Sequence, residues 1–255
     1  MAVAIITGAS SGFGRALAKA IYRKYPDIDE LWLIARRTDR LKELAEALPG
    51  RRVEVLPLDL TDMDSFDLLK AFMNAKRPIL RMLINDAGYG KFGPFRENPL
   101  EAETGMVDLN CRAVLAMTKL ALPYMQPGGC VINVASVAAF SPTPGMAVYA
   151  ATKAFAVSFT RALREELRGS RINAIAVCPG PMETEFFEVA GIDTKEERFR
   201  KFRWLPLVSV DAMAEGALRK GLARRAVYTG KPAYRIFRAL AKLLPHSLVA
   251  RLSKL

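Results

Sequence analysis

Residues 7–14 read Thr7-Gly8-Ala9-Ser10-Ser11-Gly12-Phe13-Gly14, and they join an apolar run, Val3–Thr7, to a segment of helical period, Phe13–Tyr25. Glycines at a strand–helix junction permit a tight turn and let a pyrophosphate approach the backbone at the start of the helix. The spacing Gly-x-x-x-Gly-x-Gly departs from the commoner Gly-x-Gly-x-x-Gly, so the strand before it and the helix after it carry the interpretation. The stretch predicts a dinucleotide-binding turn, and a ligand-free glycine turn is the alternative.

Strand-like and helix-like segments continue to alternate along the chain. Buried strands are predicted at Val3–Thr7, Leu31–Ala35, Val53–Leu58, Met82–Asn85, Cys130–Ala135, Ile172–Cys178 and about Ala226–Tyr228. Helices are predicted at Phe13–Tyr25, Arg40–Leu48, Ser65–Lys76, Leu100–Met125 and Tyr149–Arg168, with a final helix pair from about Ser209. This order predicts an α/β fold, a Rossmann-like doubly wound parallel sheet in three αβα layers with a C-terminal helical extension. We interpret residues 1–255 as one domain, because no linker, repeat or low-complexity tract interrupts them.

The positive charge is concentrated near the C-terminus. The chain has 255 residues, 51% hydrophobic and 25% charged, a composition that excludes disorder and a fibrous repeat. Its formal net charge is +12, of which residues 195–255 contribute +11 from 15 basic and 4 acidic side chains. A surplus of this kind suggests a polyanionic partner. Nucleic-acid binding would rest on charge alone, because no recognition motif is present, so we expect no nucleic-acid partner.

Cysteine and histidine usage argues against a metal site. Three cysteines have no paired or metal-ligand spacing, and His246 is the only histidine, so neither a metal centre nor a Ser-His-Asp triad is expected. No signal peptide fits the N-terminus, and no apolar run approaches the roughly 18–20 residues of a membrane span. The chain is therefore predicted to be cytoplasmic, with association to a membrane surface as an open alternative.

The end of the second strand suggests which dinucleotide binds. An NAD site usually has an acidic residue there for the ribose 2′-hydroxyl, whereas arginine accommodates a 2′-phosphate. This chain has Arg36 and Arg37 at that position and no acidic residue before Asp39. Guanidinium groups form charge-assisted, bidentate hydrogen bonds to phosphate. The sequence therefore favours NADP(H), and an ordinary basic loop is the alternative.

A tyrosine and a lysine four residues apart form the candidate catalytic pair. Tyr149 and Lys153 share one face of a predicted helix, and a nearby ammonium favours the phenolate form of a tyrosine. Ser136 directly follows the apolar run Val131–Ala135. Ligands of an open parallel sheet bind at the carboxyl ends of its strands. The three side chains are therefore expected to converge beside a nicotinamide ring.

With these motifs in order, the chain resembles the short-chain dehydrogenase/reductase family, in its compact single-domain form, over nearly its full length. Further segments carry the resemblance: Asp59-Leu60 after the third strand, Asn85-Asp86-Ala87-Gly88, Asn110, and Pro179-Gly180-Pro181-Met182 with Thr184. The resemblance implies NADP(H) binding by Gly8, Ser10, Ser11, Gly12, Phe13, Gly14, Arg36, Arg37, Asp59, Leu60, Asn85, Ala87, Gly88, Tyr149, Lys153, Pro179, Gly180, Met182 and Thr184.

The resemblance also implies catalytic roles. Tyr149 is expected to act as general acid in reduction and general base in oxidation, and Lys153 to hold the nicotinamide ribose and lower the Tyr149 pKa. Ser136 is expected to hydrogen-bond the substrate oxygen. Asn110 would order a water that connects Lys153 to solvent. One departure is that Asp86 replaces the second Asn of the family's Asn-Asn-Ala-Gly motif, which puts any hydrogen bond donated by that amide in doubt.

Residues 183–207 are predicted to form a substrate lid. This segment is irregular and aromatic, with Phe186, Phe187, Phe199, Phe202 and Trp204, and a lid is favoured over a purely structural core. Together with Phe140 and Met146 it predicts a lipophilic secondary alcohol or ketone, hydroxysteroid-like or a related lipid. The rival functions are a 3-oxoacyl-carrier reductase and a non-catalytic NADP(H)-binding regulator. A homodimer or homotetramer is expected from the family.

The tail at 231–255 combines an apolar face with basic side chains. Ile236, Phe237, Leu240, Leu243 and Leu244 fall on one helical face, and Lys231, Arg235, Arg238 and Lys242 fall on others. After Pro245 a second apolar stripe is formed by Leu248, Val249, Leu252 and Leu255. One interpretation is a surface helix at 232–255 that contacts anionic lipid. The favoured interpretation is a helix pair packed across the substrate entrance or a subunit interface.

Overall fold

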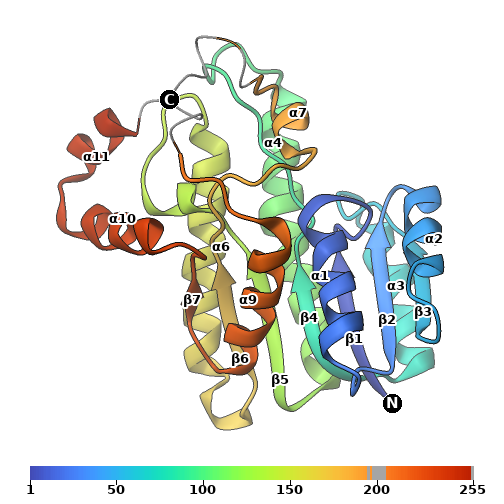
Figure 1. Cartoon of the computed structure of the whole chain (residues 1–255). Helices are drawn as coiled ribbons and strands as arrows, with labels where there is room; N and C mark the ends of the chain where they lie inside the picture. Colours follow the sequence, from blue (N-terminus) through green and yellow to red (C-terminus); the bar gives the residue numbers. More distant parts are fainter. Residues whose placement is uncertain (194–195, 197–204, 254–255) are drawn as a thin grey trace.

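A parallel β-sheet forms the centre of the computed structural model, which describes residues 1–193, 196 and 205–253. Within these residues seven strands follow the order β3-β2-β1-β4-β5-β6-β7 (Figure 1). The strands are β1 (Ala2–Thr7), β2 (Glu30–Ala35), β3 (Arg52–Pro57), β4 (Ile79–Asn85), β5 (Met125–Val134), β6 (Asn173–Val177) and β7 (Val227–Tyr228). Every neighbouring pair is parallel, so the predicted doubly wound fold is confirmed.

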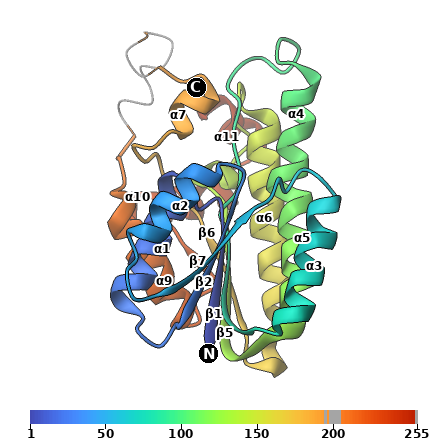
Figure 2. The same ribbon diagram turned by 90° about the vertical axis from the view of Figure 1, so that its right-hand side faces the viewer.

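Helices cover both faces of this sheet. They are α1 (Gly12–Lys24), α2 (Thr38–Glu46), α3 (Asp64–Lys76), α4 (Leu100–Val107), α5 (Ala113–Ala121), α6 (Ala147–Glu166), α7 (Phe186–Ala190), α9 (Val210–Leu222), α10 (Pro232–Leu243) and α11 (His246–Leu252). Figure 2 shows α1, α2 and α9 on one face and α3, α5 and α6 on the other. None of the helices that the structure describes has both the length and the apolar character of a membrane span.

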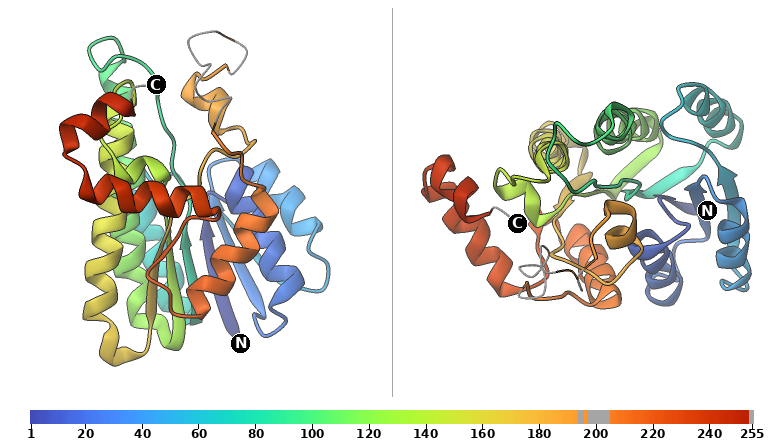
Figure 3. Two further views of the ribbon diagram at one scale, coloured as in Figure 1. Left: turned by 60° about the vertical axis from the view of Figure 1, so that its left-hand side comes forward. Right: turned by 90° about the horizontal axis from the view of Figure 1, so that it is seen from above.

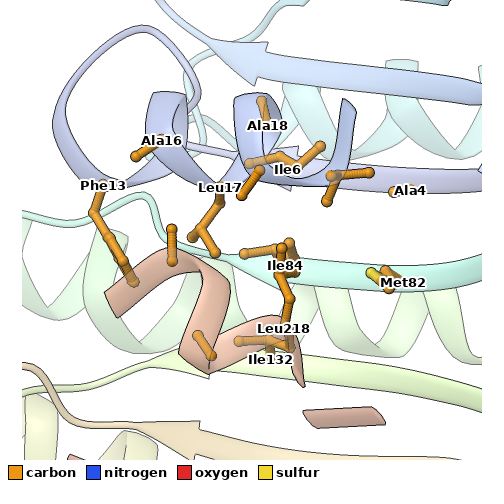
Figure 4. Close-up of a cluster of buried hydrophobic side chains, with 14 of the residues drawn as sticks. Ala4, Ile6, Phe13, Ala16, Leu17, Ala18, Met82, Ile84, Ile132 and Leu218 are labelled. Atoms are coloured by element: carbon orange, nitrogen blue, oxygen red, sulfur yellow. The ribbon is translucent and has the colours of Figure 1, made fainter. Parts of the chain in front are cut away.

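Alternate residues of each strand supply the two halves of the core. In β1, Ile6 faces α1 and α9, whereas Ile5 belongs to the cluster beneath α3 and α5. Figure 4 shows Leu17 of α1 and Leu218 of α9 meeting over this strand and its neighbours. Because both faces of the inner strands are largely buried, these strands are mostly apolar, and the sequence therefore shows them as short hydrophobic runs.

The strand order reverses beside β1. The chain passes from β1 to β2 and β3 on one side, and then returns to place β4 on the other side of β1. A crevice forms at the carboxyl ends of strands that diverge in this way, and it is where α/β sheets bind ligands. The glycine turn after β1 and residues 85–88 after β4 both open into this point.

Two predicted helices differ from the structure. The segment Leu100–Met125 is helical as far as Tyr124, but a π-helical turn at Asp108–Arg112 joins α4 to α5, and β5 begins at Met125. The expected helix pair after Ser209 is three helices, since α9 precedes β7 and α10 and α11 follow it. Apolar periodicity alone does not detect a π turn, whose one extra residue leaves the pattern almost unchanged.

The C-terminal helices lie on the β7 side of the molecule, away from α2 and β3 (Figure 3). In α10 the side chains of Tyr234 and Ala241 are buried, and the Phe237 ring lies 6.5 Å from that of Phe140. The favoured packing of the tail therefore holds for one side of α10. The predicted stripe is divided, however, because Ile236, Leu240 and Leu243 are exposed. Of the second stripe, Leu252 and Leu255 lie outside the described side chains.

Candidate active site

One continuous cavity of about 1220 Å³ occupies the carboxyl ends of the strands. It extends from the second strand's end, at Arg36 and Arg37, past Tyr149 to the C-terminal helix α10. Most of the predicted site residues line it: Gly8, Ser10, Ser11, Gly12, Phe13, Arg36, Arg37, Asp59, Leu60, Ala87, Gly88, Ser136, Tyr149, Lys153, Pro179, Gly180, Met182 and Thr184. Of the predicted residues, Gly14, Asn85 and Asn110 do not reach its wall. The fold thus gathers residues separated by more than 170 positions into one space.

The glycine turn is shaped by contact with the end of β4. Gly8 has φ of +72°, and a Cβ there would lie 2.8 Å from the Ala87 nitrogen. The Thr7 hydroxyl accepts hydrogen bonds from the Asp86 and Ala87 amides at 3.0 and 3.1 Å, which fixes the two strand ends together. A side chain at Gly14 would meet the Gly8 carbonyl oxygen and Asp86. Gly14 therefore permits the close packing of helix against turn rather than contributing to the cavity wall.

Basic side chains gather at the end of the cavity next to β2. The Arg37 guanidinium donates to the Ser10 hydroxyl at 3.3 and 3.4 Å and pairs with Glu185 at 2.9 Å. Arg40, which the sequence analysis did not identify, lies 3.7 Å from the same carboxylate. Arg36 is 3.8 Å from Asp59, and its side chain is 73% exposed. A cluster of this kind can hold a phosphate, for which Glu185 would be a competing anion.

Asp59 is held as a carboxylate beside these arginines. Its Oδ1 accepts hydrogen bonds from the Thr61 amide at 2.9 Å and the Thr61 hydroxyl at 2.7 Å. Burial acts to raise the pKa of Asp59, but these hydrogen bonds and the nearby Arg36 outweigh burial and lower it. Asp59 is thus a fixed acceptor in the cavity wall.

The predicted catalytic pair lines the same cavity. Tyr149 and Lys153 occupy the first turns of α6, and both are buried. The Lys153 ammonium donates to the Val134 carbonyl at 2.9 Å and lies 5.8 Å from the centre of the Tyr149 ring. Ser136, two residues beyond Val134, hydrogen-bonds Tyr149, and its hydroxyl accepts from the Ala138 amide at 3.2 Å. The end of β5 therefore positions both partners of the tyrosine.

Burial controls the protonation of Tyr149 in the free protein. Desolvation raises the pKa of Tyr149 to about 12, against a smaller lowering by its hydrogen bond to Ser136. This direction is opposite to the one expected from Lys153. The reason is that desolvation of the phenol is the largest effect on its pKa, and burial also lowers the pKa of Lys153, whose ammonium donates to the Val134 carbonyl. The phenol is consequently protonated at neutral pH.

Two predicted asparagines support the site from outside the cavity. The Asn110 amide, in the π-helical turn, donates to the Tyr89 carbonyl at 2.9 Å and to the Thr152 hydroxyl at 3.0 Å, while its oxygen accepts from the Tyr89 amide. Asn85 donates to Asn133 at 2.8 Å and to Thr118 at 3.1 Å, which links β4 to β5 and α5. These side chains fix the backbone around the site, and the water relay through Asn110 stays a prediction.

Asp86 is a buried carboxyl group near Lys153. It lines the cavity, and it accepts a hydrogen bond from the Gly14 backbone. Burial raises the pKa of Asp86 to about 7, while Lys153 and the Gly14 hydrogen bond act in the opposite direction. Burial therefore favours the protonated form of Asp86, and an amide at this position would not titrate.

The Asp86→Asn variant should show a weaker dependence of stability on pH. Folded Asp86 keeps a proton between about pH 4 and 7 that the unfolded chain has lost, so the wild-type free energy of unfolding falls as pH rises through that window, by up to about 1.4 kcal/mol per unit. We expect the drop between pH 5 and 7, measured by urea unfolding, to be about 2 kcal/mol smaller in the variant. The exposed Asp67→Asn change is the control, and equal slopes in all three proteins would contradict the assignment.

The far end of the cavity is apolar and includes residues that sequence analysis did not assign to it. Phe186 of α7 lies 5.4 Å from the Tyr149 ring, and Met146 is buried beside it. From the tail, Tyr234 and Phe237 of α10 line the same wall, and the Ser253 hydroxyl donates to Ser141 at 3.0 Å. The predicted lid aromatics Phe199, Phe202 and Trp204 lie outside the described residues. The sequence predicts that the tail packs across the substrate entrance or a subunit interface, and α10 does line the cavity; its contacts join distant segments, the Ser253–Ser141 hydrogen bond spanning 112 positions.

Comparisons with known proteins agree with this geometry. A family model described as short chain dehydrogenase matches residues 2–194. The chain is 37% identical over 195 residues to sulfoacetaldehyde reductase 2 of Chromohalobacter salexigens, an alignment that covers 72% of this chain and 74% of the relative. A short-chain dehydrogenase from Sphingobium yanoikuyae, solved in complex with NADPH, has 30% identity and a TM-score of 0.81 over 95% of this chain and 93% of that one. The bulky-bulky ketone specific alcohol dehydrogenase from Comamonas testosteroni has 25% identity and a TM-score of 0.77, covering 95% and 92%.

Proposed function

This chain belongs to the short-chain dehydrogenase family of oxidoreductases, and we propose that it interconverts a lipophilic secondary alcohol and the corresponding ketone using NADP(H). One observation carries the proposal: a single cavity joins a cluster of arginines, the Ser136–Tyr149–Lys153 set and an apolar wall. In order along the cavity, the arginines would bind a phosphorylated dinucleotide, the Ser136–Tyr149–Lys153 set would supply a proton, and the apolar wall would hold a hydrophobic substrate.

The residues present fit a nicotinamide dinucleotide. The glycine turn and the N-terminus of α1 line the cavity from Gly8 to Phe13, where backbone amides would face a pyrophosphate. Asp59 and Leu60 would line the adenine position, and Lys153 would hold the nicotinamide ribose. When bound, the nicotinamide supplies or accepts the hydride.

The chain's own residues handle the proton and align the substrate. Tyr149, protonated in the free protein, would donate its phenolic proton to the carbonyl oxygen during reduction and recover it during oxidation. Ser136 lies within hydrogen-bonding reach of the phenol and would hold the same substrate oxygen. The ammonium of Lys153 would stabilise negative charge that develops between them. Burial of all three groups excludes bulk water from this step.

Arginines at the end of β2 support NADP(H) over NAD(H). Arg36 and Arg37 line the end of the cavity next to β2, with the Ser10 hydroxyl beside Arg37, and Arg40 shares the Glu185 carboxylate with Arg37. Guanidinium groups at this position would give a 2′-phosphate charge-assisted hydrogen bonds that a 2′-hydroxyl cannot match. The carboxylate of Glu185 is the one opposing group that contacts Arg37 and Arg40 among the described residues.

The apolar wall supports a bulky substrate, hydroxysteroid-like or a related lipid. Phe186, Met146, Tyr234 and Phe237 surround the space beyond Tyr149. A carbonyl compound with large hydrophobic substituents would bury them there, which removes water from the substituents and from the apolar wall. Screening the wild-type enzyme with NADPH and NADH against small ketones, bulky ketones and 3-oxoacyl thioesters tests this reading. Preference for the thioesters would favour a 3-oxoacyl-carrier reductase, and absence of any turnover would favour a non-catalytic NADP(H)-binding protein.

The Phe237→Ala variant should distinguish large from small substrates. Loss of this aromatic wall is expected to lower kcat/KM about tenfold for a bulky ketone and less than twofold for acetone, because only the former reaches α10. The adjacent Ile236→Ala change, on the exposed side of the same helix, is the matched control and should alter neither value. An equal effect of Phe237→Ala on kcat/KM for both ketones would show that α10 does not contact the bulky substrate.

A further inference from the structure

We propose that α10 and the cavity beneath it form a docking site for the surface of an anionic phospholipid membrane. The site, here called the basic face, consists of the exposed side of α10 together with a cavity of about 480 Å³ next to β7. It lies apart from the cavity that contains Tyr149. Residues after 194 lie outside the region matched by the family model.

An apolar strip runs along the outer side of α10. Ile236 is 61% exposed, Leu240 is 49% exposed and Leu243 is 81% exposed. Their spacing of four, three and seven residues brings them onto one side of the helix. Tyr234 and Ala241, on the opposite side, are buried against the body of the protein. Three large apolar side chains thus face outward from a helix that already has a packed inner side.

Cations surround the neighbouring cavity without counter-charges. Its wall contains Arg219, Lys220, Arg225, Arg235 and Arg238, and no carboxylate is among the described residues that line it. These five side chains form no ion pair with any described residue, whereas Arg23 and Lys24 of α1 are both within 4.0 Å of Glu215. Five like charges around one space repel one another unless an anion enters it.

A buried hydroxyl in the same wall also lacks a partner. Thr229 is 2% exposed, and its Oγ1 makes no hydrogen bond with the described part of the chain. Buried polar groups are normally satisfied, so an unpaired hydroxyl lining a cationic cavity marks a place for an acceptor or donor from outside. A phosphate or carboxylate oxygen would fulfil that requirement.

The apolar strip and the cationic cavity both include residues of α10, and this combination indicates what binds to the basic face. Arg235 is exposed and directly precedes Ile236 of the apolar strip, whereas Arg238 reaches the same cationic cavity from the inner side of α10, one turn after Tyr234. A free phosphate would leave the apolar strip exposed, and a second copy of the chain would bring another +12 charge toward the first. A phospholipid surface offers anionic headgroups and acyl chains side by side, as amphipathic surface helices require.

Docking in this way would bring lipid next to the substrate entrance. Tyr234 and Phe237 of α10 line the large cavity on the helix's other side. A lipophilic substrate could then pass from the membrane along α10 to Tyr149. This consequence rests on the proposed function, whereas the docking itself does not.

Vesicle co-sedimentation of the full chain tests the proposal without cofactor or substrate. We expect binding to vesicles of phosphatidylcholine mixed with phosphatidylserine, and little binding to phosphatidylcholine alone. Arg235→Gln with Arg238→Gln should weaken binding about thirtyfold, since each cation near an anionic surface contributes about fivefold. Lys42→Gln with Lys70→Gln, on α2 and α3, removes the same charge from exposed positions elsewhere and should leave binding within twofold.

A second pair of variants tests the apolar strip. Ile236→Ser with Leu243→Ser should weaken vesicle binding about tenfold per side chain, because serine cannot insert among acyl chains. Leu68→Ser with Leu100→Ser is the matched control, since these leucines are 63% and 70% exposed on other helices. Unchanged circular dichroism and retained NADPH affinity would show that each variant is folded.

Several results would overturn the docking site. Equal binding to neutral and anionic vesicles, or equal binding by the basic-face variants and their controls, would contradict the proposed docking site. Inorganic phosphate that protects against thermal unfolding, without vesicle binding, would reassign the cavity to a free anion. A dimer in sedimentation velocity that Ile236→Ser with Leu243→Ser dissociates, again without vesicle binding, would make α10 a subunit interface. Because none of these measurements uses turnover, their failure is separable from failure of the proposed enzymatic activity.

Discussion

The Tyr149→Phe variant is expected to catalyse the NADPH-dependent reduction of ketones about a thousandfold more slowly than the wild type. The change removes only the hydroxyl that carries the transferable proton, and general acid catalysis contributes on the order of 10²–10⁴ in rate. The ring remains to pack against Phe186 at 5.4 Å and beneath the Lys153 ammonium. Affinity for NADPH, measured by fluorescence titration, should therefore stay within about twofold.

The controls for Tyr149 separate chemistry from folding. Tyr124→Phe removes a comparable hydroxyl, bonded to Asn74 at 2.6 Å outside the cavity, and should leave turnover unchanged. Ser136→Ala should slow reduction less than Tyr149→Phe does, because it removes a hydrogen bond to the reacting oxygen but leaves the proton donor. If Tyr149→Phe retains more than a tenth of wild-type turnover, another group supplies the proton.

The combined change Arg36→Asp and Arg37→Ala is expected to weaken NADPH binding a hundredfold or more and NADH binding less than threefold. Each charge-assisted hydrogen bond to a phosphate contributes about 1.5–3 kcal/mol, and the new carboxylate repels the 2′-phosphate. NADH lacks that phosphate, so it loses little. Titration of both cofactors against the wild type and the variant measures the difference directly.

A variant expected to strengthen NADPH binding and a control expected to leave it unchanged accompany this test. Glu185 pairs with Arg37 at 2.9 Å and lies 3.7 Å from Arg40, so Glu185→Gln should free both arginines and strengthen NADPH binding severalfold. Arg168→Ala removes an exposed arginine at the far end of α6, paired only with Glu165 among the described residues, and should change neither affinity. Equal loss of NADPH and NADH in the Arg36 and Arg37 variant would contradict the assignment to the 2′-phosphate.

The sequence allowed the sheet, the cofactor turn and the catalytic set to be predicted because each depends on local pattern. The inner strands are largely buried on both faces and so are mostly apolar, and Gly8 after β1 is required by the close approach of the Ala87 backbone. Tyr149 and Lys153 are one helical turn apart, which spacing alone reveals. Comparison with a family extended this to Asp59, Asn85 and Asn110, although two of these support the cavity without lining it.

Other parts of the site follow from long-range packing and electrostatics. Burial raises the pKa of Tyr149 to about 12 and that of Asp86 to about 7, and a residue's burial depends on what folds over it rather than on its neighbours in sequence. Glu185 approaches Arg37 across 148 positions of chain. The π-helical turn that positions Asn110 leaves the hydrophobic period almost undisturbed, so periodicity could not detect it.

The C-terminal tail shows most clearly which properties the sequence predicts and which depend on the tertiary structure. From its sequence the tail is an amphipathic helix with a basic surplus, because composition and a 3.6-residue period are local properties. Which of its apolar residues pack inward depends on the tertiary structure: Phe237 turns toward the cavity, and Ile236 and Leu243 face outward. Sequence determined the fold, the cofactor turn and the catalytic tyrosine and lysine. Only the tertiary structure decided the substrate wall, the protonation of the buried groups and the outward face of α10, since these arise from contacts between segments far apart in the chain.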